Sequence, residues 1–235
     1  MHATPSSAPS SRPGLTPAVD RARSSSAGLR RVFCGAVLLT AVATDAAAYT
    51  VSLTAAAPLT VYLQVGVGSF TNDYIYGGQP GTNTTINTVS VTVPASAVGN
   101  GTAQAMTTNS TAAQSYWDGY TYCSVPGQLY IGGFYRTTGG ATAAAQVTAT
   151  VPAALTATTG DTIPFSKIKW TSSGNGDSGA EPFPAATFVS GGVQNVGSMS
   201  SNTWNESCWT FSYVNNTVPP AGTFTGVVLY TLSAP

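Results

Sequence analysis

Apolar and polar residues alternate most clearly in the run that begins at Tyr49. Every odd position from Tyr49 to Val67 is apolar, whereas Thr, Ser and Gln recur at the even positions. A period of two is typical of a β-strand with one buried face. Pro58 interrupts the run, because proline has no N–H to give to a β-ladder. The pattern therefore predicts two strands, at 49–55 and 59–67.

Short alternating or β-branched runs continue along the rest of the chain, separated by clusters of Gly, Pro, Asn and Ser. They predict strands at 88–93, 128–135, 145–151, 163–170, 209–214 and 223–232. In the last run, residues 227–230 place apolar side chains on both faces, which favours a central strand covered on both sides. The Ala-rich stretch 102–113 has too much Thr and Asn for a helix and is expected to form a loop or edge strand. The fold class expected for 49–235 is all-β, a single immunoglobulin-like antiparallel β-sandwich.

The first part of the chain has the composition of an export signal rather than of a folded domain. Arg30 and Arg31 precede the apolar run 32–43, and small residues at 46–48 suit signal-peptidase cleavage. Residues 29–48 are therefore predicted to be a signal peptide, and the apolar run is too short for a membrane span. Residues 1–28, rich in Ser, Pro and Arg, are expected to be a disordered leader or to precede the true translation start. The mature protein would begin at Tyr49, without a membrane span.

Charge is sparse beyond the signal peptide and excludes two classes of partner. The basic residues there are Arg136, Lys167 and Lys169, and acidic residues outnumber them. Such a chain offers no basic stripe for nucleic acid or anionic lipid, so neither is expected as a partner. The surface is instead expected to be solvated by hydroxyl and amide groups.

Two cysteines remain after the signal peptide, because Cys34 lies inside it. An even number in an oxidising compartment predicts a disulfide between Cys123 and Cys208; two buried free thiols are the alternative. The bond would bring 117–118 and 204–206 into one neighbourhood.

Three segments carry a resemblance to a known family. The ending 220–232 (PAGTFTGVVLYTL), the segment 163–170 (IPFSKIKW) and the paired alternating strands at the mature start resemble bacterial chaperone-usher pilins and the spore-coat-U-like group. The resemblance implies a pilin-like sandwich, a periplasmic chaperone as partner, and self-assembly with other fibre subunits. It also implies that 49–55 acts as a donor strand, with Tyr49, Val51 and Leu53 entering the next subunit. The alternative is that this run forms one long bent strand or pairs with its own sheet. Localisation would be the periplasm and cell surface of a bacterium.

Catalytic chemistry finds little support in the sequence. His2, the single histidine, lies in the leader, so the mature chain has no imidazole for a triad or a metal site. Ser166 and Lys169 match the spacing of serine acyltransferases, but on a strand these residues would face opposite ways. No cofactor, metal or enzymatic activity is expected.

Acidic and aromatic residues leave two further functions open. The carboxylates Asp118, Asp177, Glu181 and Glu206 could serve a two-carboxylate glycoside hydrolase, with Asp118 and Glu206 better placed because each lies beside aromatics and near a cysteine. Aromatic faces stack on sugar rings, so the residues considered for glycan binding are Trp117, Asp118, Tyr120 and Trp204. The function expected is a structural subunit of a bacterial surface fibre or coat. The alternatives are a secreted carbohydrate-binding adhesin and, third, the hydrolase.

Overall fold

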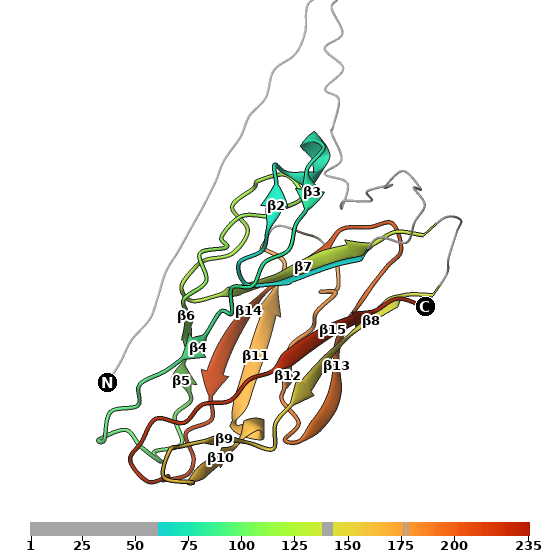
Figure 1. Ribbon diagram of the computed structural model, residues 1–235. Helices are drawn as coiled ribbons and strands as arrows, with labels where there is room; N and C mark the ends of the chain where they lie inside the picture. The colour runs from blue at the N-terminus through green and yellow to red at the C-terminus, as the bar shows by residue number, and fades with distance from the viewer. Residues whose placement is uncertain (1–60, 138–142, 176, 178) are drawn as a thin grey trace, which may run out of the picture. The chain divides into compact units, whose positions relative to one another are not determined.

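The computed structural model describes residues 61–137, 143–175, 177 and 179–235 (Figure 1). The predicted leader, the signal peptide and the strand at 49–55, with Tyr49, Val51 and Leu53, lie outside the described residues. Within the described part of the chain, no helix is long and apolar enough to cross a membrane.

Two antiparallel sheets contain most of the strand residues in the described part of the chain. The larger has the strand order β1-β7-β14-β11-β12, and β5 pairs with the end of β14. Its strands are β1 (Val61–Val65), β5 (Gln104–Ala105), β7 (Leu129–Tyr135), β11 (Ile168–Ser173), β12 (Ala186–Thr187) and β14 (Asn205–Tyr213). The smaller sheet has the order β13-β8-β15. Its strands are β8 (Ala145–Val151), β13 (Gly192–Met199) and β15 (Leu229–Ser233).

Shorter elements connect and flank these sheets. Three two-stranded pairs are formed by β2 (Phe70–Thr71) with β3 (Gln79–Pro80), β4 (Val89–Ser90) with β6 (Thr107–Thr108), and β9 (Ala154–Thr156) with β10 (Thr162–Pro164). Two single 3-10 turns are present, η1 (Tyr74–Tyr76) and η2 (Phe165–Lys167). Figure 1 shows β2, β3 and η1 grouped together near one end of the larger sheet.

The main core lies between the two sheets and follows from strand alternation. On β8 the odd residues from Ala145 to Val151 are buried, while Gln146 and Thr150 face solvent. Trp209 of β14 packs at 5.0 Å, ring centroid to ring centroid, from Trp170 of β11, and also contacts Tyr230 of the smaller sheet. The prediction of an all-β sandwich is thus confirmed.

The opposite face of the larger sheet is covered as well. All seven residues of β7 are buried, because its inward side packs in the main core and its outward side carries Tyr130 and Phe134 beneath connecting loops. Gly133 allows β1 to approach, since a Cβ there would lie 2.0 Å from the backbone oxygen of Tyr62. A layer of loops, mainly from 66–80 and 111–123, therefore lies over β1, β7 and β14.

Three expectations about strands need correction. The strand expected at 163–170 is broken: β10 ends at Pro164, and Ser166 lies in η2 rather than on a strand. The final strand starts at Leu229 rather than 223. The strand β13 was missed, because a bulge between Asn195 and Gly197 disrupts its period-two pattern. By contrast, the expectation of a loop or edge at 102–113 is confirmed by the two-residue strands β5 and β6.

Candidate functional sites

The C-terminal strand is an edge strand, which overturns the expectation of a central, fully covered one. Among the described residues, β15 pairs with β8 on one side only, at Leu229 with Thr150 through Ser233 with Gln146. Val227, just before it, is 70% exposed and Leu229 is 64% exposed. Apolar residues on both faces therefore do not mean here that both faces are covered.

The inward side of β15 is also incompletely covered. Val228, Tyr230 and Leu232 point to the main core but are only partly buried, whereas the inward residues of the neighbouring β8 are buried. On the larger sheet, Leu63 and Val65 of the edge strand β1 are likewise partly buried. β1 and β15 lie close together, and we call these partly buried residues of the two strands the open seam. The sandwich core is thus least complete where the two sheets end side by side.

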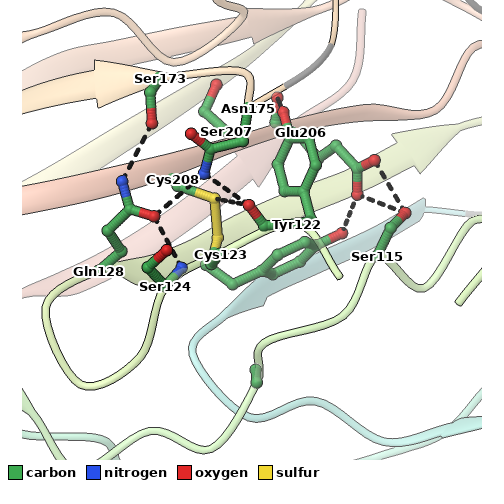
Figure 2. The surroundings of a disulfide bond; sticks show 12 residues. Ser115, Tyr122, Cys123, Ser124, Gln128, Ser173, Asn175, Glu206, Ser207 and Cys208 are labelled. Carbon is green, nitrogen blue, oxygen red and sulfur yellow. Dashed lines mark hydrogen bonds between the residues drawn. A yellow bond between two sulfur atoms is a disulfide. The ribbon is translucent and has the colours of Figure 1, made fainter. Parts of the chain in front are cut away.

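The predicted disulfide between Cys123 and Cys208 is confirmed. It joins the loop before β7 to β14 across 85 residues of sequence, with a Cα–Cα distance of 5.6 Å. Figure 2 shows the polar contacts around it. Asn175 donates from Nδ2 to the Tyr122 carbonyl and, at 3.0 Å, to Gln128 Oε1. The bond therefore ties the loop layer to the larger sheet near the 173–177 loop.

Glu206 is the most heavily hydrogen-bonded acid among the described residues. Its carboxylate accepts hydrogen bonds from Tyr130 Oη at 2.6 Å, Trp204 Nε1 at 3.0 Å and Ser115 Oγ at 2.8 Å (Figure 2 shows the Ser115 bond). The residue keeps some exposed surface, but its carboxyl group is enclosed by these neighbours. Burial raises the pKa of the Glu206 carboxyl from 4.5 to about 7, although the three hydrogen bonds act in the opposite direction. At neutral pH this acid is therefore close to half protonated.

The aromatic residues considered for glycan binding are only partly brought together. Trp117 and Trp204 lie in one aromatic cluster, 6.4 Å apart between ring centroids, and Trp117 stacks on Tyr74 at 5.2 Å. Trp204 is buried, whereas Tyr120 is 61% exposed at the turn that follows Trp117. The backbone N–H of Tyr120 donates a hydrogen bond to Asp118 Oδ1 at 2.9 Å, so Asp118 also stabilises this turn. Core packing thus accounts for Trp204, and Tyr120 is the aromatic available at the surface.

A cleft of about 590 Å³ opens beside Glu206. Its walls come from β13, from the first residues of β14, from the 179–184 loop and from Gln146 of β8. Asp177, Glu181 and Glu206 are among its lining residues, and Asp118 is not. Asp118 is nevertheless near. Burial is the larger cause of the raised pKa of Asp177, and the negative charge of Asp118 raises that pKa further. The structure therefore places Asp177 and Glu181, which were ranked behind Asp118, in the cleft with Glu206.

Sequence reasoning missed the residues that shape this cleft. Ser115 and Tyr130, which hold Glu206, come from a loop and from β7, and no spacing rule connects them with β14. Gly197 was missed too: a Cβ there would lie 2.5 Å from the Pro182 carbonyl oxygen, so the loop packs directly on the backbone of β13. The sequence pattern gave no signal for it, because the bulge beside Gly197 hides β13 from a period-two search.

Comparisons with known proteins give no match: no family model, no curated protein and no solved structure matches this chain.

Proposed function

We propose that this protein is an exported structural subunit of a bacterial surface fibre or coat, assembled by adding a strand from one copy to the open seam of the next. The observation that carries the proposal is the open seam itself. It combines an edge strand, partly covered core residues and exposed apolar side chains at one place.

An uncovered apolar edge strand is a liability unless another chain covers it. Unpaired N–H and C=O groups along such an edge serve as a template for pairing with further strands. Natural edges are usually blunted by charge or proline, yet 227–233 contains neither. This supports a role for the edge in assembly, and in the cell it gives an export chaperone a surface to cover.

The occupant we assign to the seam is the segment 49–55 of a second copy. Its odd residues, Tyr49, Val51 and Leu53, form an apolar row that could cover the partly buried residues of the open seam. Strand addition gives affinity through main-chain hydrogen bonds and specificity through alternate side-chain pockets. Full burial of a Val or Leu side chain contributes about 1.5–3 kcal/mol, so a row of three supplies a substantial part of an association energy.

A pair of neighbouring substitutions tests the proposal. Val51→Asp places a charge in the row that enters the seam, whereas Ser52→Asp places the same charge on the opposite face of the segment. We expect the full exported chain and its Ser52→Asp variant to form polymers on concentration, measured by size-exclusion chromatography and electron microscopy. Val51→Asp is expected to remain monomeric and folded. Equal assembly by the two variants, or a wild-type chain that never polymerises, would overturn the proposal.

A further inference from the structure

The cleft beside Glu206 lies at the end of the sandwich where β14 begins, and it meets the open-seam strand β15 at Gln146, which pairs with Ser233. Polar side chains in its lining include the amides of Gln146 and Asn195, which hydrogen-bond each other, the hydroxyl of Ser198, and the carboxyls of Glu181 and Glu206. None of the described residues that line it is a lysine or an arginine. Such a wall can bind hydroxyl groups as donor or acceptor and repels anions.

The enclosed carboxyl of Glu206 lowers the stability of the fold, which points to a role other than stabilisation. A carboxyl enclosed without a cationic partner destabilises the folded state, and an amide or apolar residue would avoid that cost. Yet three donors from separate elements, Ser115, Tyr130 and Trp204, fix its orientation. A positioned acid with a perturbed pKa inside a cleft is a frequent mark of a functional site.

An aromatic surface adjoins the same end of the molecule. Tyr120 is 61% exposed, and its backbone carbonyl accepts a hydrogen bond at 2.8 Å from the N–H of Ser115, the residue whose hydroxyl bonds Glu206. Ile75 bonds the Trp117 carbonyl through its backbone N–H at 3.0 Å, and the adjacent Tyr76 is 72% exposed. Exposed tyrosines beside a cleft of amides and carboxyls suit the apolar faces and hydroxyl edges of a sugar ring.

A metal ion fits this region less well. Among the described residues, no three His, Cys, Asp or Glu side chains converge in a way that could hold one.

We infer that the cleft between β13, the start of β14 and the 179–184 loop binds a neutral oligosaccharide, with Glu206 and Gln146 as hydrogen-bonding partners and Tyr120 at its rim. This binding site goes beyond the assembly role, and neither depends on the other.

The test uses the full chain and two oligosaccharides of the same linkage, galactotetraose and tetragalacturonate, which differ at C6 of each sugar, a hydroxymethyl group in the first and a carboxylate in the second. The indole N–H signal of Trp204 in NMR spectra reports on the cleft, because that group bonds Glu206. We expect galactotetraose, or one of a panel of neutral tetraoses of glucose, xylose or mannose, to shift this signal with a millimolar Kd at pH 7. Tetragalacturonate is expected to bind at least 10-fold more weakly, because its carboxylates meet those of the cleft.

Two glutamines supply a matched pair of variants. Gln146 in the cleft and Gln104 on β5 each donate to a carbonyl two residues earlier, and β5 pairs with the far end of β14. Gln146→Ala should weaken binding by about 3- to 10-fold, the loss of one hydrogen bond, and Gln104→Ala should leave it unchanged. Glu206→Gln, which keeps the shape of the side chain, should weaken it by about 10-fold or more.

The inference is overturned if no neutral tetraose shifts the Trp204 signal at 10 mM, if tetragalacturonate binds as tightly as its neutral counterpart, or if both glutamine variants bind alike. Release of reducing ends during the titration would support the site and extend its action to hydrolysis. Because the readout comes from one side chain of the subunit, a failure here leaves the assembly result unaffected, and the reverse also holds.

Discussion

Deprotonation of Glu206 should make the protein less stable as pH rises through neutrality. The carboxyl has a pKa of about 7 in the folded protein, against 4.5 as its ordinary value, so between these values the folded state holds the proton more firmly. Stability from this group is therefore greatest below pH 4.5 and is lost as pH rises through 7. A shift of this size corresponds to about 3 kcal/mol in all, of which about 2–3 kcal/mol falls between pH 5 and pH 8.

Urea unfolding of the full chain at pH 5 and at pH 8, followed by tryptophan fluorescence, measures this difference directly. The Glu206→Gln variant keeps an acceptor for Tyr130 and Trp204 but cannot titrate, so most of the pH dependence should disappear. Burial also raises the pKa of Asp177, so a dependence of stability on pH with the same sign should remain in this variant. It should be smaller than that due to Glu206, because the Asp177 side chain is exposed. A wild-type stability that is flat or rises from pH 5 to pH 8 would refute this reasoning, as would a Gln variant with an unchanged slope.

Three further changes test the packing. Replacing Cys123 and Cys208 together by Ala should lower the free energy of unfolding by up to about 4–5 kcal/mol, as expected for opening an 85-residue loop, and reductant should have no effect on that variant. Gly133→Ala should prevent β1 from pairing normally with β7, because its Cβ would lie 2.0 Å from the Tyr62 carbonyl oxygen; faster amide exchange in β1 would show this, and unchanged exchange would contradict it. Trp209→Ala should cost about 3–5 kcal/mol in chemical denaturation, because this fully buried ring contacts both sheets, and a loss below about 1 kcal/mol would contradict the core described here.

Strand alternation predicted the interior of the sandwich well, and failed where the backbone departs from regular pairing. The runs at 128–135 and 145–151 correspond closely to β7 and β8, since alternate residues of each strand pack in the main core, although the remaining residues of β7 are buried as well. On β13, Val193 is 70% exposed while Val196 and Met199 are buried, so its buried residues are three apart across the bulge. A period-two search cannot find such a strand.

The edge position of β15 could not be predicted either. Apolar residues on both faces indicate that both faces tend to avoid water, but they do not say whether a second strand of the same chain is present to cover the edge. Pairing order depends on the whole topology, which local pattern does not contain.

For the candidate sites, the sequence supplied the disulfide and the neighbourhood of Trp204 and Glu206. It could not supply the partners of Glu206, because Ser115 and Tyr130 meet it only through tertiary packing. The loop acids Asp177 and Glu181 were ranked too low, since composition alone does not show that their loop folds over the bulge of β13.

Hydrogen exchange along β15 tests the central proposal most directly. In a chain lacking residues 49–55, the backbone N–H groups of Leu229–Ser233 that do not pair with β8 should exchange rapidly, because the open seam leaves this edge uncovered. Adding a peptide of residues 49–55 should slow their exchange, and the same peptide carrying Val51→Asp should not. Protection of these amides before any peptide is added, or no change when it is added, would contradict assembly through the open seam.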